Sequence, residues 1–186
     1  MSRHSFTRPA LELLVRYARY HRDQRNISTH LVGVPMIVFA TALLLARPAL
    51  ALPGAPVTPV TPAWLAFAAL ALWTLSRGQV ALGLATTLFV GALVWAAHGL
   101  VALAEAPVLT VGLSLLVLGS LVQFIGHYYE GRRPASADDL AALLVGPMFV
   151  VLELLAMAGF CRALATQVER GAGPTKLRDL AQPLPR

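Results

Sequence analysis

The chain alternates long apolar stretches with short polar segments. Four of the apolar stretches contain no Asp, Glu, Lys or Arg, and each reaches the roughly 20 residues that a helix needs to cross a bilayer. These four stretches are residues 27–46, 48–76, 78–104 and 106–129. A fifth stretch, residues 140–161, contains a single carboxylate, Glu153. The pattern predicts an all-α integral membrane helical bundle with about five transmembrane helices.

Residues 9–21, which precede the first apolar stretch, have the spacing of an amphipathic helix. One predicted face is apolar and the other is charged: Leu11, Leu14, Val15 and Ala18 against Glu12, Arg16 and Arg19. We expect this helix to lie along the membrane surface.

Small residues recur at helical spacing in the third and fourth apolar stretches. They are Gly83, Thr87 and Gly91 in one, and Gly112, Gly119 and Gly126 in the other. Small side chains let two helix backbones approach closely, so these positions predict tight helix–helix contacts.

Arginines indicate the orientation of the bundle. Six of them precede the first apolar stretch, so the positive-inside rule places the N-terminus in the cytoplasm. The same rule places Arg77 and Arg132 inside, but five full crossings would leave the basic tail outside. A re-entrant break at Pro147 would return the tail to the cytoplasm, and the sequence leaves both alternatives open. The predicted organisation is a cytoplasmic amphipathic segment, a transmembrane domain and a cytoplasmic or flexible tail: residues 1–26, 27–162 and 163–186.

Composition agrees with a lipid environment. Hydrophobic residues make up 57% of the 186 residues and charged residues only 13%, against about 25% charged residues in soluble domains. The net charge of +6 is not arranged as a basic stripe interleaved with aromatic residues, so we expect no nucleic-acid partner. The single cysteine, Cys161, excludes an intramolecular disulfide and a thiolate cluster within one chain. The bias towards Ala, Leu and Arg suggests a GC-rich bacterium and therefore a multi-pass protein of its inner membrane.

Three histidines converge on the predicted cytoplasmic end of the bundle. His21 closes the amphipathic helix, His30 begins the first crossing and His127 ends the fourth. Nine residues at 100° each would set His21 and His30 on opposite sides of a continuous helix, so a shared site requires a break between them. The polar run at residues 22–25 predicts that break, and Asn26 is better suited to cap the next helix than to bind a ligand.

A second group of polar residues occupies one face of the fourth stretch. Gln123, His127 and Glu130 follow one another at four and three residues, on a face expected to point at His30. Imidazoles with a carboxylate or water, and with positions left open, suit an Fe(II) ion that must bind substrate and dioxygen together. Zinc accepts the same ligands, and histidines that merely form interfacial hydrogen bonds are the alternative. His98, near the other membrane face, is best explained as such a packing residue.

Two segments resemble a known family. Residues 20–30 read YHRDQRNISTH and are followed by Gly33 and Pro35, and residues 123–135 read QFIGHYYEGRRPA. Both resemble the membrane 2-hydroxy fatty acid dioxygenases, the Fe(II)-dependent enzymes of fatty acid α-oxidation in phytosphingosine breakdown. The last apolar stretch is similar to that family too, whereas residues 47–118 resemble it only in hydropathy.

The resemblance implies roles for individual residues. His21, His30 and His127 would be the iron ligands, and Glu130 would be a catalytic carboxylate that binds the metal or orients one of its ligands. Independently of the resemblance, the position of Arg133 after the fourth stretch suggests that it either holds the substrate carboxylate or anchors the topology. The residues expected around the ligands are Asn26, Gln123 and Glu153, the last of which would otherwise pair with a cytoplasmic arginine.

The resemblance also implies a reaction. A non-haem iron dioxygenase would cleave a long-chain 2-hydroxy fatty acid between C1 and C2 with dioxygen, without 2-oxoglutarate, and leave a fatty acid one carbon shorter. The substrate's carboxylate and hydroxyl can chelate Fe(II) on the cytoplasmic side while its acyl chain stays in the lipid bilayer. Two other classes stay open: a haem-binding membrane protein with His30 and His127 as axial ligands, and a non-catalytic packing or transport protein.

Overall fold

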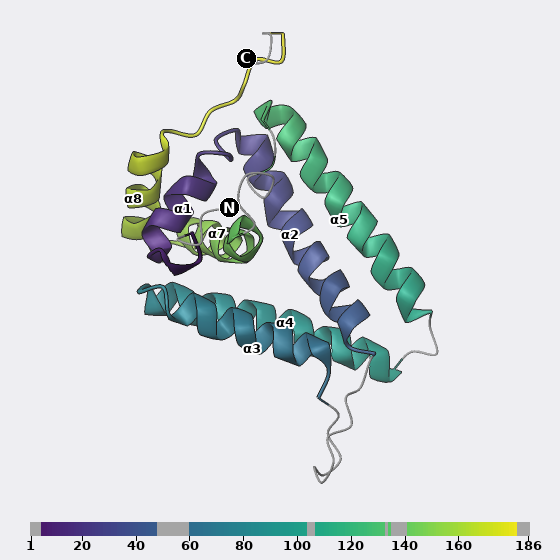
Figure 1. The fold of residues 1–186 in the computed structure, drawn as a ribbon. Coiled ribbons are helices and arrows are strands. Elements are labelled where there is room, and N and C mark those ends of the chain that lie inside the picture. The colour runs from purple at the N-terminus through teal and green to yellow at the C-terminus, as the bar shows by residue number, and fades with distance from the viewer. Residues whose placement is uncertain (1–4, 48–59, 104–106, 133, 135–140, 182–186) are drawn as a thin grey trace.

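The computed structural model describes residues 5–47, 60–103, 107–132, 134 and 141–181 of the chain. Apart from isolated bridge positions, Asp23 with Lys176 and also Val60, the regular secondary structure of these residues is helical (Figure 1). The helices are η1 (Ser5–Thr7), α1 (Ala10–Ala18), α2 (Gln24–Leu45), α3 (Pro62–Leu75), α4 (Val80–Leu103), α5 (Val108–Glu130), α7 (Ala141–Met157) and α8 (Arg162–Ala172). The predicted all-α fold is therefore confirmed for the described part of the chain.

Three of the described helices, α2, α4 and α5, are long and apolar enough to cross a membrane. The helices α3 and α7 are also apolar but have only 14 and 17 residues. At ~1.5 Å per residue they are about 21 and 26 Å long, shorter than a hydrocarbon core of about 30 Å. Every predicted apolar stretch contains a helix, but the predicted count of five full crossings is not confirmed.

Local signals explain where several helices begin and end. Asp23 caps α2, since its Oδ1 accepts a hydrogen bond from the backbone N–H of Arg25 at 2.9 Å. Pro62 opens α3 at a position where its fixed φ suits the helix. Gly131 ends α5 with a φ of 71°, a left-handed conformation that favours glycine. The predicted break between α1 and α2 is confirmed, but Asn26 lies inside α2 and is not its cap.

Helices α2 and α5 pack closely along their length because glycines face the contact (Figure 1). A Cβ added at Gly126 would overlap the side chain of Thr29 and lie 2.5 Å from Oδ1 of Asn26. A Cβ added at Gly119 would lie 2.9 Å from Cγ1 of Ile37. The predicted role of these small residues is confirmed, and the close approach brings the polar ends of α2 and α5 together.

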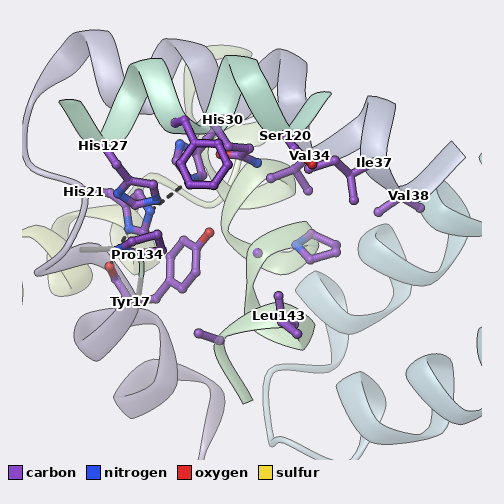
Figure 2. A pocket seen from close by; sticks show the side chains of 15 residues that line it. Tyr17, His21, His30, Val34, Ile37, Val38, Ser120, His127, Pro134 and Leu143 are labelled. Atoms are coloured by element: carbon purple, nitrogen blue, oxygen red, sulfur yellow. Dashed lines mark hydrogen bonds between the residues drawn. The ribbon is translucent and has the colours of Figure 1, made fainter. Parts of the chain in front are cut away.

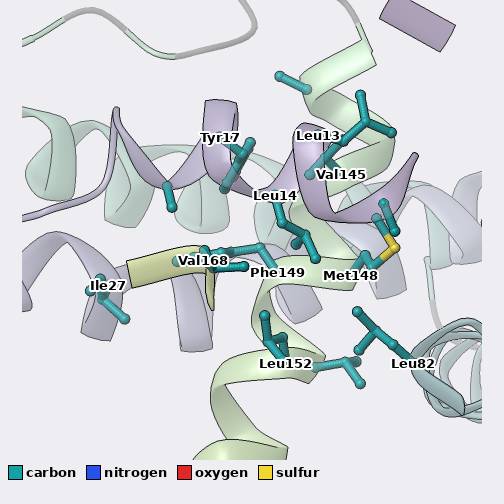
Figure 3. Packing of buried hydrophobic residues seen from close by; sticks show 14 residues of the cluster. Leu13, Leu14, Tyr17, Ile27, Leu82, Val145, Met148, Phe149, Leu152 and Val168 are labelled. Carbon is teal, nitrogen blue, oxygen red and sulfur yellow. The ribbon is translucent and has the colours of Figure 1, made fainter. Parts of the chain in front are cut away.

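A buried apolar cluster joins α1 to α7 and α8 (Figure 3). It includes Leu13 and Leu14 of α1, Met148 and Phe149 of α7, and Val168 of α8. The predicted surface helix over residues 9–21 is therefore the shorter α1, and its apolar face is covered by protein instead of lying on the membrane. The apolar helix α7 and the apolar side of the amphipathic helix α8 offer that face a partner inside the same chain, so it needs no lipid.

The basic segments gather at one end of the bundle. The N–H of Ala10 donates to the carbonyl oxygen of Arg77 at 2.9 Å, which holds the start of α1 against the α3–α4 turn. The guanidinium of Arg19 donates to the carbonyl oxygen of Gly171, and that of Arg132 donates to the carbonyl oxygen of Arg19. The start of the chain, the end of α5 and the tail therefore lie together, as the positive-inside pattern predicts. The membrane side that this end faces stays a prediction.

Helix α7 continues through Pro147 without interruption, so the re-entrant break considered at this proline is absent. After α7 the chain turns at Gly159 and Cys161, both at positive φ, and α8 then packs against α1. A fifth full crossing would carry α8 to the end of the bundle away from α1. The structure instead keeps α8 and the tail at the end where the chain begins.

Candidate metal centre

Three buried histidines meet where the α1–α2 turn approaches the ends of α2 and α5. His21 lies in the turn, His30 in the second turn of α2 and His127 in the last turn of α5, with exposed fractions of 1%, 2% and 8%. Each offers one ring nitrogen, and these three nitrogens lie within 4.8 Å of one another. Figure 2 shows their rings pointing toward a common point. The predicted convergence is confirmed, and their role as metal ligands is a proposal.

Backbone carbonyls set the protonation of two of these rings. Nδ1 of His21 lies 2.7 Å from the carbonyl oxygen of Tyr17, and Nδ1 of His30 lies 2.8 Å from that of Asn26. A carbonyl oxygen can only accept, so each Nδ1 carries the hydrogen and each Nε2 presents its lone pair. Burial lowers the pKa of His21 well below its ordinary value, and the adjacent His30 lowers it further, so His21 is neutral at pH 7.

The two lone pairs face each other. Nε2 of His21 and Nε2 of His30 are only 3.0 Å apart, although the tautomers leave no hydrogen between them. A cation bound to both nitrogens would remove the repulsion between the lone pairs. Two metal–nitrogen bonds of about 2.1 Å that meet at a right angle place the two nitrogens about 3.0 Å apart. His127 adds a buried Nδ1 that has no hydrogen-bond partner among the described residues. This donor set fits a borderline metal ion such as Fe(II) or Zn(II).

An apolar cavity leads away from the histidines between α2, α5 and α7. Its volume is about 250 Å³, and it follows one face of α2 from His30 along Val34, Ile37 and Val38 (Figure 2). Phe124 of α5 and Leu143 of α7 also line the cavity, and each is 63% exposed on the outside of the bundle, so they mark its opening. The remaining lining residues are Tyr17, His21, Ser120, Gln123, His127, Pro134, Ala142, Gly146 and Pro147. The cavity can therefore take an apolar chain whose polar end lies at the histidines.

Glu130 does not join the histidine cluster. Its Oε2 accepts hydrogen bonds from the backbone N–H groups of Arg22 and Asp23, both at 2.8 Å, and from Nδ2 of Asn26 at 3.1 Å. The expected contact with the free ring nitrogen of His127 is not made. Glu130 therefore holds the turn that carries His21, and its catalytic role stays a prediction.

The other predicted residues fall into different places. Gln123 lines the cavity, and its Oε1 is buried without a partner in the described part of the chain. Asn26 orients His30 through its backbone carbonyl and bonds Glu130 through its side chain. Glu153 does not line the cavity. Burial lowers the pKa of Arg22, and the negative charge of Glu153 opposes this lowering, so its role as partner of an arginine stays a prediction. Arg133 lies outside the described residues.

His98 packs at a distance from this site. Its Nε2 is 2.8 Å from Oγ1 of Thr61, and its ring stacks on Trp64 with centroids 5.0 Å apart. Both ring nitrogens are used, since Nδ1 lies 2.8 Å from the carbonyl oxygen of Val94. This agrees with the packing role that the sequence favours.

Two residues of the site, Tyr17 and Asp23, were not predicted from the sequence. The ring of Tyr17 stacks on His21 with centroids 4.2 Å apart, and it also lines the cavity. Asp23 is fully buried at the start of α2. The i−4 spacing of Tyr17 from His21 was a usable signal for the first. For Asp23 the cap on Arg25, two residues later, was a local signal, whereas the bond from Arg178 comes from 155 residues away and could not be foreseen.

A haem between His30 and His127 fits this geometry poorly. Two axial imidazoles occupy opposite faces of a porphyrin, and the macrocycle fills the plane between them. Nε2 of His21 lies 3.0 Å from Nε2 of His30, where porphyrin atoms would have to be. The close third imidazole therefore favours a non-haem ion.

Comparison with known proteins identifies the family of the chain. The model of the family described as 2-hydroxy-palmitic acid dioxygenase Mpo1-like matches residues 8–158. The 2-hydroxy-palmitic acid dioxygenase MPO1 of Saccharomyces cerevisiae is 30% identical over 158 residues, which cover 82% of this chain and 83% of the yeast protein. No solved structure matches the chain. The resemblance carried by the two histidine segments is confirmed, and the chain belongs to the 2-hydroxy-palmitic acid dioxygenase Mpo1-like family.

Proposed function

We propose that this chain is a membrane dioxygenase that uses Fe(II), held by His21, His30 and His127, to shorten long-chain 2-hydroxy fatty acids by one carbon. The observation that carries the proposal is the pair of Nε2 lone pairs, 3.0 Å apart, at the polar end of an apolar cavity. The family name supports the substrate class, and the three converging imidazoles support a metal ion.

The reaction balances with one dioxygen. If the 2-hydroxy acid supplies all four electrons that dioxygen accepts, the bond between C1 and C2 breaks, C2 becomes the new carboxyl carbon, and C1 leaves as carbon dioxide together with one water. Bound Fe(II) would supply the site where substrate and dioxygen meet and exchange electrons.

The residues of this chain would bind and orient the substrate. The acyl chain lies along Val34, Ile37 and Val38, with its carboxylate and hydroxyl at the histidines. Oε1 of Gln123, which has no partner in the described structure, accepts a hydrogen bond from the hydroxyl of the acid. The stacked ring of Tyr17 and the apolar walls keep bulk water away from the reacting carbons. The acid would enter the cavity from the lipid between Phe124 and Leu143.

The test uses the full chain, purified without oxygen and loaded with Fe(II). Adding 2-hydroxypalmitate and air should yield the 15-carbon fatty acid with one dioxygen consumed per product, measured by mass spectrometry and an oxygen electrode. Protein loaded with Zn(II) serves as the control and should yield none, because zinc has no redox chemistry. An iron-loaded protein that leaves the acid intact would show that the proposal is wrong.

A further inference from the structure

We infer that residues 173–178 form a strap that positions the metal centre by holding the turn between α1 and α2, with Asp23 as the residue through which it acts. The inference rests on the proposed metal site, because the turn carries His21. The strap lies beyond residues 8–158, the part of the chain that matches the family. It is therefore a feature of this chain that the family match does not imply.

The part of the turn from Arg22 onward is not held by apolar burial. Residues 22–25 have no apolar side chain, yet Arg22 and Asp23 are 7% and 0% exposed. Buried backbone groups of such a segment need hydrogen-bond partners. The N–H groups of Arg22 and Asp23 donate to Oε2 of Glu130, and the N–H of Gln24 donates to the carbonyl oxygen of Lys176 at 3.0 Å. Glu130 and the tail together therefore pair the backbone N–H groups of residues 22–24.

The strap bonds the turn at several points along its length. The N–H of Lys176 donates to the carbonyl oxygen of Arg22 at 2.8 Å, which forms the bridge of parallel sense beside Asp23. The guanidinium of Arg22 donates to the carbonyl oxygen of Gly173 at 2.6 Å. The guanidinium of Arg178 reaches the carbonyl oxygens of Tyr128 and Tyr129, next to His127. The strap therefore ties the turn that carries His21 to the end of α5 that carries His127.

Asp23 connects the strap to the helix that carries His30. Its Oδ2 accepts from the backbone N–H of Arg178 at 2.7 Å, and its Oδ1 accepts from the backbone N–H of Arg25 at 2.9 Å. The guanidinium of Arg25 bonds both oxygens, at 2.9 and 2.8 Å, and also donates to the carbonyl oxygen of Arg178. A buried carboxylate with this many donors is costly to replace, because each lost bond leaves a donor unpaired.

The experiment measures metal binding. Lys176→Pro removes the N–H that bonds Arg22, and Lys176→Ala is the matched control that keeps it. Asp23→Asn keeps a side chain able to cap α2 but replaces one acceptor oxygen with a donor. Anaerobic titration of the full-length proteins with Co(II), followed by visible spectroscopy, should show a dissociation constant raised roughly 10- to 100-fold for Lys176→Pro and Asp23→Asn, as for residues that support metal ligands. Lys176→Ala should bind as the parent does.

The outcomes separate positioning from general stability and from failure of the metal site. A strap that only stabilises the fold would lower the melting temperature of the metal-free variants but leave their Co(II) affinity and spectrum unchanged, which would overturn the inference. If Lys176→Pro does not fold, Asp23→Asn decides, with the same expected and contradicting results. If the parent itself binds no Co(II) or Fe(II), the proposed function fails and the strap inference falls with it.

Discussion

Two backbone carbonyls, those of Tyr17 and Asn26, determine how the site histidines present their nitrogens. Each carbonyl accepts from Nδ1 of the histidine four residues later. Nε2 of His21 and Nε2 of His30 therefore carry no hydrogen and present a lone pair to the cluster. His98 has the same i−4 bond to Val94, but its Nε2 is already used by Thr61. The difference between a proposed metal ligand and a packing histidine therefore lies in the partner of Nε2.

Replacing His30 with Ala should remove bound iron while the protein stays in the membrane. The change deletes one donor nitrogen and leaves the apolar face of α2 intact. Iron per chain, measured after anaerobic purification, should fall at least tenfold, in line with the loss of a metal ligand. His98→Ala is the control and should keep its iron, and a His30 variant with the parent's iron content would exclude His30 as a ligand.

Replacing Gln123 with Leu should weaken substrate binding without removing iron. Leu keeps most of the volume but cannot bond the head of the acid, and a hydrogen bond of this kind is worth about 1 kcal/mol. The KM for 2-hydroxypalmitate should therefore rise about fivefold, while iron content stays that of the parent. An unchanged KM would mean that the unpaired Oε1 of Gln123 does not meet the substrate.

At the scale of helices, the α2–α5 contact sets the spacing of the site. The histidine on α5 can approach the one on α2 only because Gly126 and Gly119 let the backbones come close. The same contact places Glu130 against the start of α2, where it bonds Asn26 and the turn before it. One close helix pair therefore positions both a proposed metal ligand and the carboxylate that holds the turn.

Gly126→Ala should separate α2 from α5. The new Cβ would overlap Thr29 and crowd Oδ1 of Asn26, and overpacking of this kind costs about 1–3 kcal/mol. We expect a lower melting temperature in detergent and a clear loss of iron, because His127 moves away from His30. Gly99→Ala is the matched control, since a Cβ there meets nothing within 4 Å. Equal effects of the two changes would contradict this account of the contact.

At the scale of the whole molecule, the site lies where the chain's distant parts meet. The N-terminal helix, the α3–α4 turn, the end of α5 and the tail gather at one end, and the cavity opens from there toward the outside of the bundle. A polar reaction centre at an interface and an acyl chain among helices suit an amphiphilic substrate. We propose that this end faces the cytoplasm, on the strength of its arginines.

The cavity should limit the length of the acyl chain. Val38 lies eight residues, or about 12 Å along α2, from His30, and it lines the end of the cavity farther along this helix face (Figure 2). Val38→Phe should lower kcat/KM for 2-hydroxypalmitate more than for a shorter 2-hydroxy acid, with a shift of roughly tenfold in the ratio. Competition between the two acids in one assay measures that ratio. An unchanged ratio would mean that the acyl chain of the substrate does not lie beside Val38.

Much of the fold could be predicted because each apolar stretch is a local property of the chain. The helices α2, α4 and α5 follow from run length and apolar composition, and the break before α2 follows from the polar run at residues 22–25. The number of full crossings did not follow. The sequence around α7 is apolar enough to span, but its length and the return of α8 to α1 are set by packing.

The sequence by itself determined the helical class, the family and the gathering of His21, His30 and His127, since each depends on residue types at short spacing and on counting helices. Only the tertiary structure decided that Glu130 holds the turn and does not orient a metal ligand, and that the tail bonds the side chain of Asp23. These contacts join residues more than a hundred positions apart. Their partners are selected by which buried N–H groups remain unpaired once the helices have packed, and no local pattern records that.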